Sequence, residues 1–181
     1  MPIKKIILLT FFLTYNLLTL SQTDLTASLI NNGDFEKGIH VDWQLELKGN
    51  AKANYLDAGK FEAAYGGHAA KVVVTEKDYM HHVILKKVIV SKNIYGKSMT
   101  YSIKASALEN EMSSIMRVNA YSKNSEIIDY AQTQMWLKKD GLFKVYSLTF
   151  TIPLNTNHIE LLIWCGGKKG TYLFDDFTIN R

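Results

Sequence analysis

The sequence predicts an all-β fold, a two-sheet antiparallel β-sandwich. Three observations support this fold class. Many short segments are rich in Val, Ile, Thr, Tyr and Phe, which are enriched in strands. Turn signals such as Lys48-Gly49-Asn50 and Lys139-Asp140-Gly141 separate them. No segment after residue 21 keeps a helical period over about ten residues. Short strands with hairpin-length gaps favour a sandwich or jelly roll. The predicted strands are 43–48, 51–57, 69–75, 81–90, 98–107, 115–122, 129–136, 144–152, 159–165 and 171–179.

Residues 1–21 have the pattern of a secretory signal peptide. Two lysines precede an apolar run over residues 6–20, and a small-residue cleavage site ends at Ser21. The alternative is a membrane anchor, but the run is short for a span of about 20 residues, and no stop-transfer pattern follows. The sequence therefore predicts a secreted protein, extracellular or periplasmic, without a membrane span. Its single domain covers residues 22–181.

Charge and cysteine usage limit the partners and the sources of stability. Without Lys4 and Lys5, the 21 basic residues become 19 against 17 acidic ones, a net charge near +2. That bias is too weak to indicate nucleic acid or an anionic membrane as a partner. Cys165 is the one cysteine, so no internal disulfide can form, and its apolar strand pattern predicts a buried, inert thiol. We expect a monomer that is stabilised by its core.

Strand alternation assigns the side chains to faces. The residues expected in the core are Met99, Tyr101, Ile103, Ala105, Met116, Val118, Ala120, Ala131, Thr133, Met135, Tyr146, Leu148, Phe150 and Ile152. Those expected to point away from it include Thr100, Ser102, Lys104, Ser106, Val145, Ser147, Thr149 and Thr151.

Two further outward sets are unlike an ordinary solvent-exposed face. Segment 115–122 presents a guanidinium, an amide and a phenol, and segment 129–136 presents two amides and two aromatic rings. Sugars pack their C–H faces on aromatic rings, and their hydroxyls bond to amides and Arg, so this mixture favours a carbohydrate ligand. The alternative is a parity error of one residue, which would bury the rings. The candidate cleft residues are Arg117, Asn119, Tyr121, Tyr130, Gln132, Gln134 and Trp136, with Tyr79 and His81 at a rim.

Acidic residues stand at both ends of the domain. Alternation places Asp175 on the same face as Leu173, Phe177 and Ile179, so we expect its carboxylate to need a partner in the interior. Glu36 could meet Asp175 around a cation and join the first strand to the last. The alternative is a salt bridge from Asp175 to Lys or Arg at the sheet edge. A glycosidase pair of these two acids is disfavoured, because both would be occupied away from the cleft.

Six segments, in this order, resemble carbohydrate-binding modules of the family 4/9/22 type. They are Asn32-Gly33-Asp34-Phe35-Glu36, Trp43, Ala64-Tyr65-Gly66-Gly67-His68, Gly96-Lys97-Ser98-Met99-Thr100-Tyr101-Ser102, Tyr146-Ser147-Leu148-Thr149-Phe150-Thr151-Ile152-Pro153 and 170–177. The resemblance covers about residues 29–180. Its departures are His68, where members usually have Lys, and Phe143, where many have Trp.

The resemblance implies a galactose-binding-like jelly roll that binds a polysaccharide or oligosaccharide in a cleft on the concave sheet. It also implies a structural calcium ion, with carboxylates from Glu36 and Asp175 and backbone carbonyls near Asp34, Gly67 and His68. Calcium suits such a set of oxygen ligands. Such modules usually accompany polysaccharide-degrading enzymes, which are the protein partners that the resemblance suggests.

The sequence predicts a non-catalytic binding module, with two alternatives. One is a small glycoside hydrolase or lyase on the same scaffold, with Tyr121 or Tyr130, Arg117 and a His in the cleft. The other is a protein-interaction module that has lost sugar binding. No nucleophile elbow, phosphate-binding loop, dinucleotide fingerprint or metalloprotease motif is present in the sequence.

Overall fold

The structure is a computed structural model, and it describes residues 30–49, 51–58, 63–64, 66–76, 82–109, 111–165 and 168–181. The predicted signal peptide, Tyr79 and His81 lie outside the described residues. Within these ranges the secondary structure is ten strands and one short 3₁₀ turn, Lys92–Ile94.

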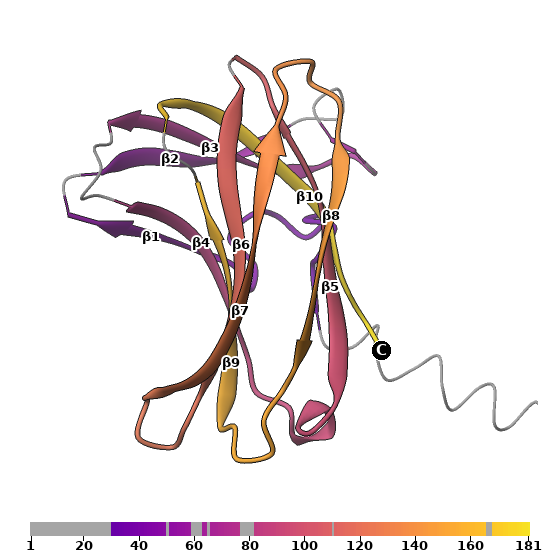
Figure 1. The fold of residues 1–181 in the computed structure, drawn as a ribbon. Coiled ribbons are helices and arrows are strands. Elements are labelled where there is room, and N and C mark those ends of the chain that lie inside the picture. The colour runs from indigo at the N-terminus through magenta and orange to yellow at the C-terminus, as the bar shows by residue number, and fades with distance from the viewer. Residues whose placement is uncertain are drawn as a thin grey trace, which may run out of the picture.

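All ten predicted strands are confirmed, with ends that differ by a few residues, and they form two five-stranded antiparallel sheets (Figure 1). Sheet 1 has the order β1-β4-β9-β6-β7, and sheet 2 has the order β2-β3-β10-β5-β8. The strands are β1 (Gln44–Lys48), β2 (Lys52–Ala58), β3 (Ala69–Glu76), β4 (His82–Ile89), β5 (Ser98–Ala107), β6 (Met112–Tyr121), β7 (Ile127–Leu137), β8 (Lys144–Thr151), β9 (His158–Trp164) and β10 (Gly170–Asn180).

The core lies between the two sheets, and strand alternation fills it as predicted. Tyr101 and Ile103 of β5 face it from sheet 2, and Met116 and Val118 of β6 face it from sheet 1, all buried. Cys165 is a buried free thiol, as expected. Burying apolar side chains stabilises the fold by about 25 cal/mol per Å² of apolar surface, which is how a domain with no disulfide can hold together.

The face assignment of β10 is wrong at its N-terminal half. Leu173 and Asp175 pair with Ser106 and Lys104 on the outer side of sheet 2, whereas Phe177 and Ile179 reach the main core. The reason is an irregularity between Asp175 and Thr178, where the register shifts. Asp176 has a φ of 48° there. An inserted residue of this kind reverses the alternation of the strand.

A second, smaller apolar cluster covers part of the outer side of sheet 2. Leu173 packs there with Ala58 and Ala69, against Leu108 and Phe143. Ser106 points away from the main core, as predicted, but it is buried rather than solvent-exposed, because it is the cross-strand partner of Leu173 beneath this cluster.

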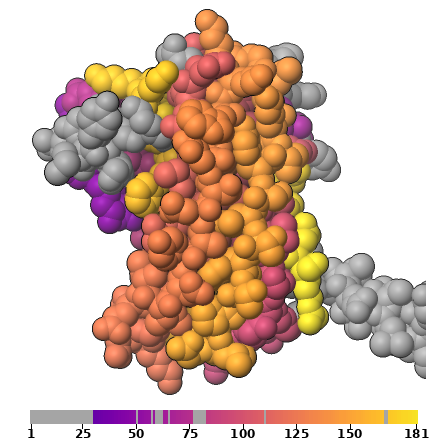
Figure 2. Space-filling model, viewed as in Figure 1, coloured from indigo at the N-terminus to yellow at the C-terminus, as the bar shows by residue number. Residues whose placement is uncertain are grey.

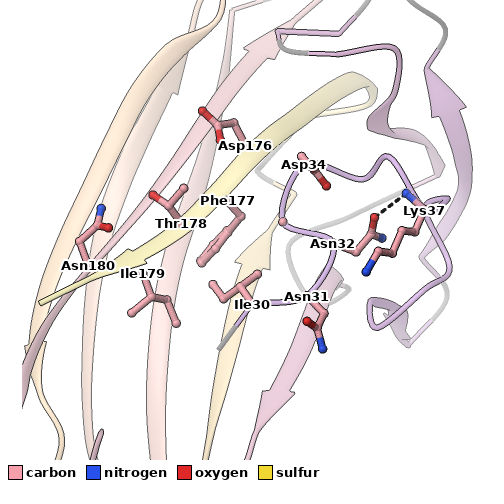
Figure 3. A pocket seen from close by; sticks show the side chains of 11 residues that line it. Ile30, Asn31, Asn32, Asp34, Lys37, Asp176, Phe177, Thr178, Ile179 and Asn180 are labelled. Atoms are coloured by element: carbon pink, nitrogen blue, oxygen red, sulfur yellow. Dashed lines mark hydrogen bonds between the residues drawn. The ribbon is translucent and has the colours of Figure 1, made fainter. Parts of the chain in front are cut away.

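The N-terminal turn connects both sheets. The backbone N–H of Phe177 in β10 donates to the carbonyl of Gly33 at 2.7 Å, and the ammonium of Lys87 in β4 donates to the carbonyl of Asn31 at 2.7 Å. Trp43 is buried against Phe177, with ring centroids 5.3 Å apart, so its role is structural. The turn and β10 line a hollow of about 440 Å³. Figure 3 shows Asn31 and Asn32 of the turn and Phe177 of β10 at this hollow.

Replacing Gly33 with Ala should destabilise the protein. An added Cβ would stand 2.0 Å from the backbone oxygen of Phe177, so the turn would have to move away from β10. We expect a loss of about 1–3 kcal/mol in the free energy of unfolding, measured by chemical denaturation. The control is Gly67→Ala, whose Cβ would meet only a Glu36 carboxylate oxygen at 3.6 Å, an ordinary contact. Equal stability of both variants would contradict the close approach at Gly33.

Candidate functional site

Seven polar and aromatic side chains lie on the outer face of sheet 1 and form what we call the strip. It consists of Arg117, Asn119 and Tyr121 of β6 and Tyr130, Gln132, Gln134 and Trp136 of β7. β7 is the edge strand, and it lies beside β6 in antiparallel register, with Arg117 opposite Gln132 and Asn119 opposite Tyr130 (Figure 1). Directly opposed residues share a face, so the register brings these side chains together.

The predicted parity of β7 is confirmed. Trp136 is 67% exposed and Tyr130 is 54% exposed, whereas Met135 is buried in the core. Tyr146 of β8 donates its hydroxyl to the backbone oxygen of Trp136, which links the edges of the two sheets. The surface along these neighbouring edges, in orange tones, faces the viewer in Figure 2. An indole this exposed is available to stack on a ligand.

Arg117 is held in place at the centre of the strip. Its Nε donates to Asn119 Oδ1 at 2.6 Å, and its Nη1 reaches Gln132 Oε1 at 3.5 Å. The centre of the guanidinium lies 4.1 Å from the ring centroid of Tyr130, a cation–π contact. These contacts fix the plane of the guanidinium before any ligand arrives.

Asn119 shares the predicted face, but it is only 4% exposed. Its amide accepts from Arg117 and donates to the Tyr121 hydroxyl at 3.3 Å. Asn119 therefore positions its neighbours rather than presenting a free amide at the surface.

The strip continues into charged residues on the neighbouring strands. The Tyr121 hydroxyl donates to Glu160 Oε2 of β9 at 2.9 Å, and the Tyr121 ring stacks on His158 with centroids 4.7 Å apart. Lys86 of β4 lies between Glu160, at 3.8 Å, and Glu46 of β1, at 3.2 Å. Burial and the bond to Glu160 raise the pKa of Tyr121, which makes its phenol a weaker acid and keeps the hydroxyl protonated.

Several residues of this face were not among the predicted ones. Trp164 and Leu162 lie on it, because they pair with Ile115 and Arg117 of β6. The apolar run Ile159, Leu161 and Ile163 was the available signal, since it places the residues between them on the opposite face.

Two of the predicted metal ligands, Glu36 and Asp175, bond to described residues of segment 63–68, which lies between β2 and β3 and contains Gly67 and His68. Glu36 Oε1 accepts hydrogen bonds from the backbone N–H groups of Gly67, at 2.7 Å, and His68, at 2.9 Å. Asp175 is fully buried, and its Oδ2 accepts from the backbone N–H of Ala64 at 2.8 Å. The two carboxylates thus attach the N-terminal turn and β10 to one segment.

The acidic side chains of this region have oxygen atoms that suit calcium, but each is already bonded to the backbone. Asp34 Oδ1 accepts from the Glu36 backbone N–H at 3.4 Å, so all three acids are engaged with backbone amides. Within the described ranges, no three His, Cys, Asp or Glu side chains are grouped closely enough to hold a metal ion. A carboxylate has about four acceptor positions, so the observed bonds leave capacity for a cation that backbone carbonyls would help to hold.

Comparisons with known proteins place the fold. No protein-family model matches the chain, and no curated protein matches its sequence. The solved structures that resemble it include the TmCBM61 module in complex with β-1,4-galactotriose, with a TM-score of 0.64 and 16% identity over 84% of this chain and 97% of that one. They also include a CBM4 module, with a TM-score of 0.62 and 18% identity over 83% and 98%.

A third similar structure belongs to a much longer protein. The active domain of tailspike protein 4 of bacteriophage CBA120 has a TM-score of 0.67 and 11% identity, and the match covers 84% of this chain but only 21% of that one.

The likeness to the TmCBM61 and CBM4 modules shows that the chain has the jelly-roll fold of carbohydrate-binding modules, as the resemblance implied. No helix among the described residues is long and apolar enough to cross a membrane.

The bonds of Glu36 predict a pH dependence of stability. The backbone N–H groups of Gly67 and His68 lower the pKa of the Glu36 carboxyl below its ordinary value. A carboxyl whose pKa is lowered by folding stabilises the protein above its unfolded pKa, about 4.3, and this stabilisation is lost as the pH falls through the folded pKa.

We therefore expect the unfolding free energy of the wild type to fall below about pH 4.3 more steeply than that of Glu36→Gln, measured by denaturation across pH. Glu126→Gln, at an exposed acid in the turn before β7, is the control and should keep the wild-type slope. Identical slopes for wild type and Glu36→Gln would contradict the assigned role.

Proposed function

We propose that this chain is a secreted, non-catalytic carbohydrate-binding module that binds a polysaccharide or oligosaccharide along the strip. The observation that carries the proposal is the exposed indole of Trp136 in line with two glutamines, Tyr130 and the immobilised Arg117. Flat rings stack on sugar C–H faces, while amide and guanidinium groups bond to hydroxyls. The fold likeness supports it, since the TmCBM61 structure contains β-1,4-galactotriose.

The mode of binding follows from the shape of the strip. Gln134 and Gln132 lie between Trp136 and Tyr130 on one face of an edge strand, so a chain that follows β7 could contact all four side chains. The proposed site includes the predicted rim of Tyr79 and His81, which stays a prediction because both residues lie outside the described ones. Association with polysaccharide-degrading enzymes and a monomeric state belong to the same proposal.

The described geometry does not favour the enzymatic alternative. A lyase base must accept a proton, but the Tyr121 hydroxyl donates to Glu160 and its pKa is raised. Glu36 and Asp175, the other acids considered for catalysis, bond to backbone amides of segment 63–68 instead of lying on the strip.

Trp136→Ala should abolish glycan binding and leave the fold unchanged. Loss of a stacking ring costs about 1–3 kcal/mol in comparable ring-stacking systems, which weakens binding by about 5- to 150-fold in Kd. An exposed side chain contributes within about 0.5 kcal/mol to stability, so the thermal midpoint should hardly move. Affinity electrophoresis and calorimetry against a panel of soluble polysaccharides measure both effects.

The matched control is Val145→Ala, which removes an exposed apolar side chain from the outer side of sheet 2. It should bind like the wild type. A folded wild-type protein that is retarded by no polysaccharide, or a Trp136→Ala variant that binds normally, would contradict the proposed function.

We also propose that a structural calcium ion binds near segment 63–68, with Glu36 and Asp175 as carboxylate ligands and carbonyls near Asp34, Gly67 and His68 completing the shell. What supports this is the oxygen-only donor set and the fact that both acids bond to the same segment. A chelator should lower the thermal midpoint and added calcium should restore it, because an ion bound only to the folded state stabilises that state. Magnesium is the control cation. A thermal midpoint that changes with neither chelator nor calcium would contradict the calcium site. The hydrogen bonds of Glu36 and Asp175 would then link these segments without an ion.

A further inference from the structure

We propose that the strip is specific for acidic polysaccharides, with Arg117 as the group that binds a uronate carboxylate. This inference rests on the proposed function and names its ligand class. It starts from the chemistry of a single side chain, because Arg117 is the cation that lies among the amides and rings of the strip.

The charge balance of the face points to a missing anion. Lys48 of β1 and Lys86 of β4, two other cations on this side of sheet 1, both pair with Glu46, and Lys86 also lies near Glu160. The partners of Arg117 are instead the neutral side chains Asn119, Gln132 and Tyr130. Within the described part of the chain, Arg117 forms no ion pair, so none of the described side chains neutralises its charge.

The guanidinium is prepared for a planar anion. It has five N–H donors in a rigid fork, and the amides of Asn119 and Gln132 occupy two of its three nitrogens, Nε and Nη1. The ring of Tyr130 supports one side of it. A carboxylate can take parallel hydrogen bonds from such a fork, which gives both strength and directional selectivity.

A neutral sugar would be a poorer occupant of this position. A ligand that covers Arg117 removes water from its charge, and hydroxyl groups compensate that loss less well than a carboxylate does. Glu160 does not provide the compensation, because its carboxylate bonds to Tyr121 and lies beside Lys86.

The spacing favours a polymer over a single uronic acid. Gln132, the cross-strand partner of Arg117, stands four residues from Trp136 on β7, which is about 13 Å along an extended strand. That is longer than one sugar ring, so the ring that stacks on Trp136 and the carboxylate that reaches Arg117 belong to different residues of one chain.

The test compares polymers that differ only in charge. Polygalacturonate and alginate are each titrated beside their carboxyl-reduced forms, and carrageenan beside its desulfated form, by calorimetry with the full mature chain. We expect at least one uronate polymer to bind about tenfold more tightly than its reduced form, the gain typical of a charge-assisted bond. Rising sodium chloride should remove this preference.

Variants assign the preference to Arg117. Arg117→Gln should bind the acidic polymer and its reduced form equally, and Arg117→Lys should recover only part of the preference, since it keeps the charge without the fork. The control is Lys144→Gln, which removes an exposed positive charge from β8 in sheet 2 and should change nothing. Thermal midpoints verify that each variant folds, and the salt series tests the wild type without any substitution.

The outcomes separate the two proposals. Binding of neutral polymers that is lost in Trp136→Ala, without preference for a uronate form, overturns the acidic ligand and keeps the proposed function. A preference that is confined to carrageenan, or that survives in Arg117→Gln, also overturns this inference. If no polymer of the panel binds, both proposals fail.

Discussion

The register between β6 and β7 is the constraint on which the candidate site depends. Met116 and Val118 of β6 and Met135 and Leu137 of β7 are buried in the core, and the residues that alternate with them must face outward. A slip of one residue in either strand would place apolar side chains in water and bury the ring of Trp136 or the charge of Arg117. The free energy that holds the core therefore also holds the outward side chains in their order along the strip.

The strip combines open and immobilised groups. Trp136 and Tyr130 are exposed, whereas Asn119 is buried beneath the surface and fixes both Arg117 and Tyr121. Binding to groups that are already ordered avoids part of the entropy lost when free side chains are immobilised. The buried amide therefore contributes to recognition by orienting its neighbours, although a ligand on the surface would not need to touch it.

The N-terminal turn, residues 30–41, does not contribute to the strip but connects the two ends of the chain. Gly33 bonds to Phe177 of sheet 2, Asn31 accepts from Lys87 of sheet 1, and Glu36 bonds to the segment that Asp175 also reaches. Each of these contacts joins residues far apart in the sequence. A domain without a disulfide gains from such links, because they hold together segments that the sheets alone leave at their margins.

The sequence by itself determined the ten strands, the core faces of most of them and the outward position of Trp136, because strand alternation is local and repeats every two residues. Only the tertiary structure decided the rest. The irregularity at Asp175–Thr178 reversed the faces of β10, and the second cluster buried Ser106. The register across sheet 1 brought Trp164, Glu160 and Lys86 to the strip. Such features arise from pairing between distant segments, and no local pattern specifies which strands become neighbours or where a strand gains a residue.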